Sequence, residues 1–169
     1  MQHEIFMSKA LEHAQEALHH NEFPVGCVLV HDQSIIASGK REGSLENNET
    51  DHAEINAIKN LIQYEKSNNL SIPRDKIILY CTLEPCLMCF AALLIHDIRH
   101  IVYAYEDVMG GGTKIDLQSL PCLYKDRPVT ILPGIMREKS LKLFHTFFQH
   151  SNHRYLQGTT LAIYTLNQK

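Results

Sequence analysis

The amino-acid sequence predicts an α/β fold in which a mixed, mostly five-stranded sheet lies between two layers of helices. Apolar residues recur at helical spacing in several segments, and runs typical of β-strands lie between them. The predicted order of elements is α-β-β-α-β-α-β-β-α, an alternation that places helices on a sheet. The chain has 169 residues, of which 44% are hydrophobic and 21% charged, the size and composition of one globular domain.

The first part of the chain predicts one helix followed by two strands. Over 5–18 the apolar residues recur near helical spacing, and Asn21 can end the helix. The β-branched run at 25–30 and the apolar residues at 35–37 flank a polar turn, as in an antiparallel hairpin. The polar stretch 42–50 then predicts a surface loop, where binding groups often lie.

Two further helices are predicted in the middle of the chain. Thr50 or Asp51 can cap a second helix that runs to about Tyr64. Pro85 favours the first turn of a third helix over 86–96. Each of these helices follows a loop that leaves a strand.

Three more strands and a last helix complete the predicted order. The continuous apolar run at 77–81 is typical of a strand in the middle of a sheet that is covered on both faces. Segments 98–105 and 129–132 predict two more strands, and 136–148 predicts a helix. Residues 159–166 have strand propensity and predict an extra edge strand, or a segment that docks on a second subunit.

The chain is expected to form a single domain over 1–158, with 159–169 as a C-terminal tail. It contains no internal repeat, low-complexity segment or linker that would divide it. The N-terminus lacks the pattern of a secretory signal, and the apolar run at 86–95 is shorter than the roughly 18 residues that span a membrane. We therefore expect a cytoplasmic protein that has no membrane partner.

The charge balance argues weakly against nucleic acid as a partner. Lys and Arg total 16 and Asp and Glu total 19, which gives a net charge of −3. A protein of this charge has no general basic field to attract phosphates, although a local basic patch remains compatible with it.

The cysteines point to metal or redox chemistry. Five cysteines form an odd set without the density of a disulfide scaffold, and Cys86 and Cys89 stand as Cys-x-x-Cys. Zinc favours nitrogen and sulfur ligands, and a catalytic zinc site has three protein ligands with water in the fourth position. His52, Cys86 and Cys89 supply such a set, and a helix N-terminus stabilises the thiolates that bind metal.

Glu54 is the candidate catalytic residue. It lies two positions after His52, in the same first turn of a predicted helix. A carboxylate there can reach a zinc-bound water without itself binding zinc, take its proton and pass it to a substrate. The combination of His-x-Glu and Pro-Cys-x-x-Cys is the signature of zinc-dependent deaminases of nucleobases.

Two other classes of function stay open. Cys-x-x-Cys alone is compatible with a thiol redox module. It is also compatible with a non-catalytic zinc site that takes a fourth protein ligand from another cysteine or a histidine. Glu54 argues against the second class, because a structural zinc site has no use for a carboxylate beside an open position.

At these motifs the chain resembles the cytidine deaminase-like superfamily, and within it the bacterial tRNA-specific adenosine deaminases. The matching stretches are 23–30 (FPVGCVLV), 52–58 (HAEINAI) and 79–89 (LYCTLEPCLMC), and the similarity runs from the first helix to about Phe148. The resemblance implies a three-layer α/β/α domain and a homodimer.

The resemblance also implies the chemistry and the residues of the site. One zinc ion would be held by His52, Cys86 and Cys89, with water or hydroxide as the fourth ligand and Glu54 as the proton shuttle. The base would lie against the residues Ala53, Glu84 and Pro85. Hydrolysis would replace an exocyclic amine with a carbonyl and release ammonia.

The sequence departs from this family at Arg41. Counting back from His52 without gaps, Arg41 occupies the position at which the tRNA deaminases have an asparagine that contacts the substrate. A guanidinium only donates hydrogen bonds and prefers carboxylate or phosphate. Arg41 is therefore a candidate substrate-binding residue. The alternative is a solvated surface residue, with Asn47 or Asn48 in the binding role.

Two more departures concern the later part of the chain. Asp107 matches an aspartate of the family and is a further substrate-binding candidate, but three glycines follow at 110–112. They form a flexible turn or allow the backbone to approach a ligand. The last helix of the tRNA enzymes tends to end in a basic run, whereas 147–154 carries one arginine. Because phosphate contacts supply much of the affinity for nucleic acid, this weakly basic end and the net charge of −3 argue against a tRNA substrate.

The sequence thus predicts a zinc-dependent hydrolytic deaminase of a nucleobase-containing substrate. Adenosine in tRNA is the substrate that the resemblance implies. A free base, a nucleoside or a nucleotide, built on guanine, cytosine or a related base, is the alternative.

Overall fold

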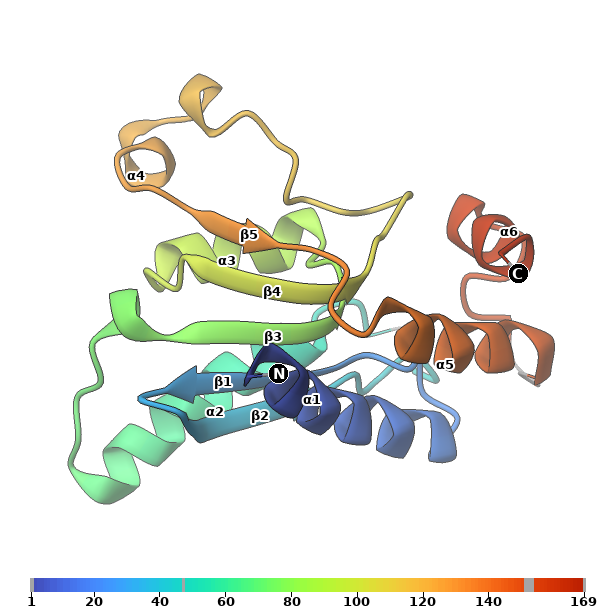
Figure 1. The fold of residues 1–169 in the computed structure, drawn as a ribbon, viewed down its shortest axis with the longest axis horizontal. Helices are drawn as coiled ribbons and strands as arrows, with labels where there is room; N and C mark the ends of the chain where they lie inside the picture. The colour runs from blue at the N-terminus through green and yellow to red at the C-terminus, as the bar shows by residue number, and fades with distance from the viewer. Residues whose placement is uncertain (1, 47, 151–153, 169) are drawn as a thin grey trace.

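The centre of the molecule is a five-stranded sheet with the strand order β2-β1-β3-β4-β5 (Figure 1). The structure, a computed structural model, describes residues 2–46, 48–150 and 154–168. The strands are β1 (Gly26–His31), β2 (Ser34–Lys40), β3 (Ile78–Leu83), β4 (His100–Tyr105) and β5 (Thr130–Leu132). β1 pairs antiparallel with β2 and β3, whereas β3, β4 and β5 pair in parallel. The prediction of a mixed sheet in an α/β fold is confirmed.

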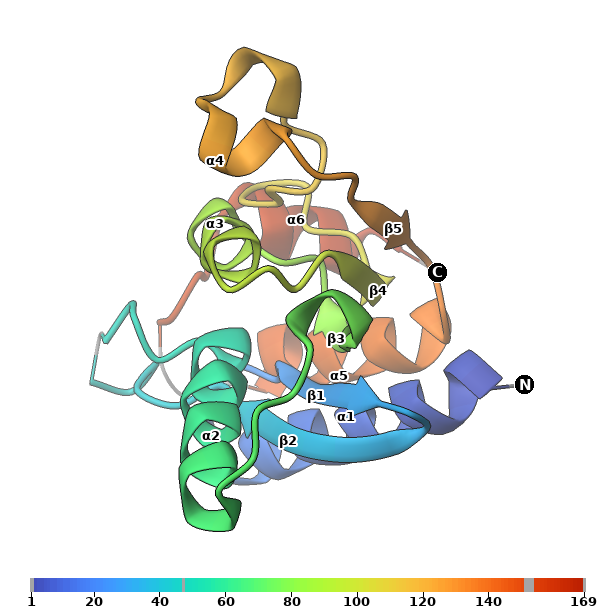
Figure 2. The ribbon, with the colours of Figure 1, turned by 90° about the vertical axis from the view of Figure 1, so that its left-hand side faces the viewer.

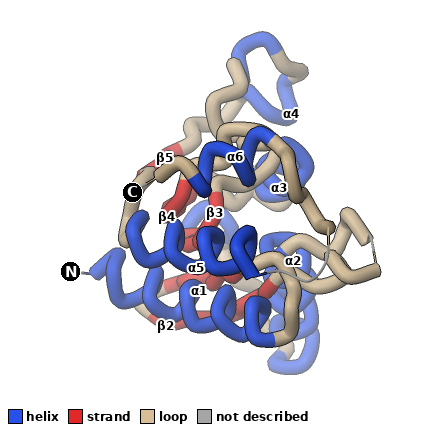
Figure 3. Tube along the Cα trace, turned by 90° about the vertical axis from the view of Figure 1, so that its right-hand side faces the viewer, coloured by secondary structure: helices blue, strands red, loops and turns tan. Residues whose placement is uncertain are grey.

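Helices cover both faces of this sheet. They are α1 (Gln2–His19), α2 (Ala53–Asn68), α3 (Leu87–Ile95), α4 (Cys122–Lys125), α5 (Arg137–His150) and α6 (Thr160–Leu166), with short 3₁₀ helices at Arg74–Lys76 and Leu117–Ser119. Figure 2 shows α2 and α3 on one side of the sheet, and Figure 3 shows α1 and α5 side by side on the opposite side. None of the helices described is long and apolar enough to cross a membrane.

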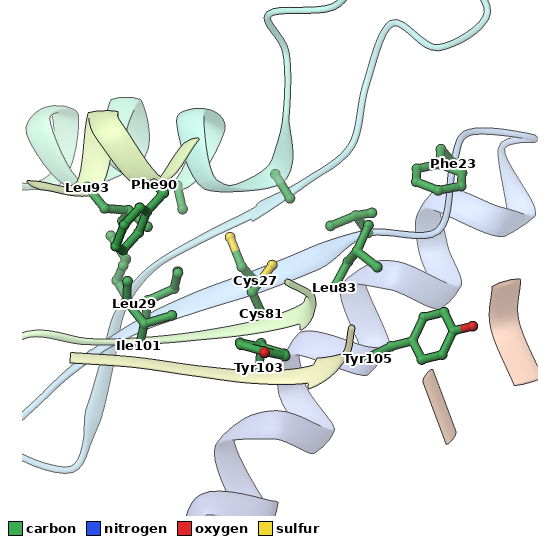
Figure 4. Close-up of a cluster of buried hydrophobic side chains, with 14 of the residues drawn as sticks. Phe23, Cys27, Leu29, Cys81, Leu83, Phe90, Leu93, Ile101, Tyr103 and Tyr105 are labelled. Carbon is green, nitrogen blue, oxygen red and sulfur yellow. The ribbon is translucent and has the colours of Figure 1, made fainter. Parts of the chain in front are cut away.

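The alternation of side chains along β1 explains the two helical layers. Successive residues of a strand point to opposite faces of the sheet. Val28 and Val30 lie in the core under α1, whereas Cys27 and Leu29 lie in the core under α2 and α3. Figure 4 shows this second core, in which Phe90 of α3 packs above the sheet. Every residue of the strand is therefore buried against one layer or the other, apart from its last.

Cys27 and Cys81 are ordinary residues of this core. They are directly opposite each other in the pairing of β1 with β3, and both are fully buried free thiols (Figure 4). Burial raises the pKa of both thiols. The group of described side chains that could hold a metal ion consists of His52, Cys86 and Cys89 and includes neither of these thiols.

The predicted edge strand at 159–166 is wrong, because this segment forms the helix α6. The hydroxyl of Thr159 accepts a hydrogen bond from the backbone N–H of Ala162 and caps the helix. Leu161, Ala162 and Thr165 share one buried face, and the Thr165 hydroxyl is hydrogen-bonded to that of Tyr105 at 3.1 Å. A cap and one buried face outweigh the strand propensity of the residues.

The predicted start of the second helix is also corrected. α2 begins at Ala53, and the position that precedes it is His52, whose side chain makes no capping hydrogen bond. Asp51 instead binds the side chains of Lys59 and Asn48. The helix start is therefore occupied by the candidate metal ligand itself.

Candidate metal centre and substrate cavity

The three candidate zinc ligands meet where two helices begin. His52 and Cys86 are the N-cap residues of α2 and α3, and Cys89 lies in the first turns of α3. Nδ1 of His52 is 3.5 Å from Sγ of Cys86 and 3.4 Å from Sγ of Cys89. The three ligand atoms lie within 4.8 Å of one another, and Cys89 is fully buried.

These distances fit a tetrahedral zinc ion. Zn–S bonds of about 2.3 Å and Zn–N bonds of about 2.05 Å at the tetrahedral angle place N and S about 3.6 Å apart. The observed separations of 3.5 and 3.4 Å are close to that value, and they converge on Nδ1 of His52. One nitrogen and two sulfurs are also the donor set that zinc prefers.

The electrostatics of the cluster favour a metal-binding thiolate. Hydrogen bonds from Cys89 and His52 outweigh burial and lower the pKa of Cys86 to about 4. The hydrogen bond to Cys86 raises the pKa of Cys89, because the first thiolate disfavours a second one. Burial opposes a charge on His52, but the Cys86 thiolate outweighs it and raises the pKa of the imidazole. A divalent cation would relieve the repulsion between the two sulfurs.

Glu54 lies beside this cluster in the first turn of α2 and is 3% exposed. Burial, followed by the charge of Cys86, raises the pKa of Glu54 to about 7. Its side chain lines the same cavity as His52 and Cys86. A carboxyl group in that position can hold or release a proton near neutral pH, as acid–base chemistry requires.

A cavity of about 170 Å³ opens beside the cluster. Its described lining includes apolar residues from the first loop, from β3 and from the C-terminal segment: Phe23, Val25, Leu83, Leu156 and Leu161. Polar side chains are set among them. A mostly apolar cavity with a few polar groups is typical of a small-molecule binding site.

The structure places most of the predicted substrate-binding residues at this cavity. Ala53, Glu84, Asp107 and Arg41 belong to its lining. Pro85 is not part of the described lining, and its carbonyl accepts a hydrogen bond from the Gly112 N–H at 2.9 Å.

The carboxylates of Glu84 and Asp107 are engaged in holding a loop. Glu84 accepts hydrogen bonds from the Thr113 hydroxyl at 2.5 Å and from the Asp107 N–H at 3.2 Å. Asp107 accepts from the N–H groups of Met109 and Gly110, both at 2.9 Å. Both side chains therefore shape one wall of the cavity through the loop 107–113.

The three glycines belong to the same loop, and Gly110 is part of the cavity lining. A Cβ atom on Gly111 would lie 2.6 Å from the Glu84 carboxyl carbon, and one on Gly112 would lie 2.7 Å from Cα of Leu87. Neither has a positive φ, so the requirement is close approach of the backbone and not a special conformation. The glycines let the loop 107–113 pack against the start of α3.

Arg41 is not a solvated surface residue, because only 2% of it is exposed. Arg41 is part of the wall of the cavity. Asn48 binds Asp51 and Thr50 within its own loop, and Asn47 lies outside the described residues.

Sequence reasoning missed the contribution of the C-terminal segment. Tyr155, Leu156 and Leu161 line the cavity, and Glu49 joins them from the loop before α2. Tyr155 and Arg41 are 114 positions apart yet hydrogen-bonded at 3.1 Å. No spacing in the sequence signals such a contact.

Comparison with known proteins gives concordant matches. Residues 1–105 match the family model of the cytidine and deoxycytidylate deaminase zinc-binding region. The chain is 35% identical over 153 residues to tRNA-specific adenosine deaminase 2 of Xenopus tropicalis, a match that covers 87% of this chain and 89% of the relative. It is 30% identical over 149 residues to tRNA-specific adenosine deaminase of Streptococcus pyogenes serotype M18, covering 88% and 91%.

A solved structure agrees with these relatives. It comes from a study of A-to-I editing by tRNA:A34 deaminases, is 31% identical in sequence and superimposes with a TM-score of 0.68, covering 82% of this chain and 97% of that one. The matched region contains both helix starts that carry His52, Glu54, Cys86 and Cys89. The chain therefore belongs to the cytidine and deoxycytidylate deaminase zinc-binding family, and it is a deaminase of the zinc type that acts on a nucleobase or nucleoside.

Proposed function

We propose that this enzyme binds one zinc ion through His52, Cys86 and Cys89 and uses Glu54 to move protons during hydrolytic deamination. The observation that carries the proposal is the convergence of the three ligand atoms beside a buried carboxyl group on one cavity. Among the described residues this cluster has three ligand atoms, which supports water as the fourth ligand.

A zinc ion held by these residues would supply Lewis acidity that lowers the pKa of water. Glu54 would take one proton from the attacking water and donate it to the ring nitrogen, and would then take the remaining proton of the newly added hydroxyl group and donate it to the departing amine. The substrate loses ammonia and gains a carbonyl. Leu83, Leu156 and Leu161 keep the base in an apolar environment, and the backbone around Ala53 lies beside it.

Adenosine in tRNA is the first candidate substrate, and it is supported by the relatives named tRNA-specific adenosine deaminases. A free base, nucleoside or nucleotide is the second candidate. It is supported by the net charge of −3 and by the buried Arg41 in the cavity.

The deaminase proposal is tested by ammonia release from adenine, guanine and cytosine compounds and from an anticodon stem-loop RNA. The zinc-loaded wild type is compared with Glu54→Gln, which keeps the size of the side chain but cannot shuttle a proton. Loss of the general acid–base is expected to lower kcat by about 10²–10⁴-fold while zinc content stays unchanged. No turnover of any compound by the wild type would leave the deaminase assignment without support.

We also propose that two copies of the chain associate through α3 and that the enzyme works in the cytoplasm. The apolar side chains of Leu87, Met88 and Ile95 are exposed on α3, which supports a protein interface on that helix. Sedimentation of the wild type and of Ile95→Glu would test the dimer. The cytoplasmic location is supported by the five cysteines, all of them free thiols.

A further inference from the structure

Arg41 is a buried cation in the wall of the substrate cavity. Its backbone N–H donates to the Val25 carbonyl at 2.8 Å, which fixes the residue just beyond the end of β2. The guanidinium lies 5.5 Å from the ring centre of Tyr155, and Nη2 donates to the Tyr155 hydroxyl at 3.1 Å. These contacts hold the guanidinium group in one orientation.

Two nitrogens of this guanidinium have no partner among the described residues. Nε and Nη1 are buried and make no hydrogen bond, and Arg41 as a whole is 2% exposed. A buried charged donor without a partner costs several kcal/mol, and native proteins almost always satisfy such groups. Nε and Nη1 therefore lack the hydrogen-bond partners that a buried guanidinium normally has, at a residue that lines the cavity.

The charge of Arg41 is also poorly compensated. Glu49 is its ion-pair partner, at 3.4 Å from Nη2, but the Glu49 side chain is 64% exposed and so is well screened by water. Glu84 and Asp107 line the same cavity but accept their hydrogen bonds from the loop 107–113. No carboxylate of the described residues reaches Nε or Nη1.

We propose that Arg41 binds an anionic oxygen group, a carboxylate or a phosphate, that the substrate carries beside the amino-substituted base. A guanidinium has only hydrogen-bond donors, in a forked geometry that matches a carboxylate or a phosphate. An anion therefore accepts hydrogen bonds from the two buried nitrogens and neutralises the positive charge as well. This inference rests on the proposed function, because the proposed function places the amine of the substrate at the zinc centre. It makes Arg41 the residue that selects acid-bearing substrates.

Tyr155 and Glu49 orient this group. The Tyr155 hydroxyl donates to Glu49 at 3.1 Å and accepts from Arg41 at 3.1 Å, so the three side chains form a closed triangle. The triangle occupies Nη2 and leaves Nε and Nη1 for the ligand. The loop before α2 and the C-terminal segment thus both act on the substrate through Arg41.

The test compares matched pairs of compounds that differ by one acidic group: adenosine and its 5′-monophosphate, cytidine and its 5′-monophosphate, and cytosine and 5-carboxycytosine. An anticodon stem-loop RNA distinguishes a phosphodiester of RNA from the phosphate of a mononucleotide. For at least one acid-bearing compound, kcat/KM of the wild type is expected to exceed that of its neutral partner by about tenfold or more, or the RNA is turned over. Arg41→Gln should lower kcat/KM for the acid-bearing compound more than for its neutral partner, so that most of that advantage is lost.

A binding measurement without turnover accompanies the kinetics. Inorganic phosphate or acetate is expected to raise the Tm of the zinc-loaded wild type, and to raise that of Arg41→Gln much less. Lys40→Gln is the matched control, because Lys40 is the neighbouring cation but its ammonium faces Glu16 at 3.3 Å, away from this cavity. Arg41→Lys keeps the positive charge but not the forked donor geometry, so its kcat/KM advantage and its Tm shift should be intermediate. It replaces Arg41→Gln in the test if that variant fails to fold.

Equal loss of activity on both members of every pair in Arg41→Gln, with no shift of the wild-type Tm by either anion, would overturn the proposal. RNA turnover that depends on Arg41, with no advantage for mononucleotides, would support it and assign the anion to RNA. If the wild type deaminates nothing, the proposed function fails. The Tm measurements then still decide whether Arg41 binds an anion.

Discussion

The carboxylate of Glu84 accepts a hydrogen bond from the hydroxyl of Thr113 at 2.5 Å, and this contact ties the loop 107–113 to the turn that precedes Cys86. Glu84 is 3% exposed and Thr113 is 8% exposed, so water competes little for the bond. The loop and the metal centre are therefore one structural unit.

The first prediction concerns the glycines of this loop. Gly112→Ala places a methyl group 2.7 Å from Cα of Leu87, a backbone atom in the first turn of α3. We expect a loss of about 1–3 kcal/mol in the free energy of unfolding, and weaker zinc binding because Cys86 precedes Leu87. Denaturant unfolding and zinc titration measure the two effects.

Gly110→Ala is the control for that prediction. Its Cβ would lie 3.0 Å from Oδ2 of Asp107, a side-chain atom that can move aside. A smaller loss of stability is expected. Equal effects of the two substitutions would contradict the close approach of Gly112 to α3.

The second prediction concerns the metal. Cys89→Ser replaces the sulfur of a buried candidate ligand with an oxygen that binds zinc weakly, so the content of zinc per chain should fall, and deaminase activity with it. Elemental analysis of the purified protein measures the zinc. Cys122→Ser, at an exposed cysteine, should keep both zinc and activity.

The third prediction concerns α6. Leu161 is 1% exposed and lines the cavity, so Leu161→Ala should cost about 2–5 kcal/mol in the free energy of unfolding and raise KM. Ile163 is on the exposed side of the same helix, and Ile163→Ala should change stability by less than about 0.5 kcal/mol. A Leu161 variant as stable as the Ile163 variant would show that α6 does not pack on the core.

The fourth prediction concerns stability in acid. Burial alone would raise the pKa of Glu106, but hydrogen bonds from Arg137 and Tyr164 outweigh it and lower the pKa to about 2, from an ordinary value of 4.5. The folded state therefore binds this proton more weakly than the unfolded state. The stabilisation is complete above the unfolded pKa and is lost as the pH falls from about 5 toward 2.

Glu106→Gln should remove that part of the pH dependence and lower stability at neutral pH. Urea unfolding from pH 2.5 to 7 measures both. Glu138→Gln is the control, because Glu138 is 70% exposed and pairs with its neighbour on α5, Arg137, at 3.4 Å. An unchanged slope in the Glu106 variant would contradict the prediction.

The meeting of His52, Cys86 and Cys89 was predictable from the sequence because its signals are local. Cys86 and Cys89 are three positions apart at one helix start, and His52 and Glu54 are two apart at another. The fold has only to bring the two helix starts together, and this follows from the strand–loop–helix order. The sheet was predictable for a similar reason, since the apolar runs of β1 and β3 are continuous.

The C-terminal helix was not predictable in this way. The residues of α6 have strand propensity, and its helical form depends on burial against Tyr105, about 60 positions earlier. The burial of Arg41 likewise depends on Tyr155, which comes from the far end of the chain. Long-range packing of this kind leaves no periodic pattern in the sequence.

The placement of Tyr155 and Leu161 separates two properties of the enzyme along its chain. All three candidate metal ligands and Glu54 lie between positions 52 and 89, whereas part of the wall of the cavity comes from 155–161. Changes in the last segment can therefore alter which molecule enters the cavity while the reaction at the metal stays the same. Diversification of substrates among related chains is expected to concentrate in this C-terminal stretch and at the Arg41 position that it contacts.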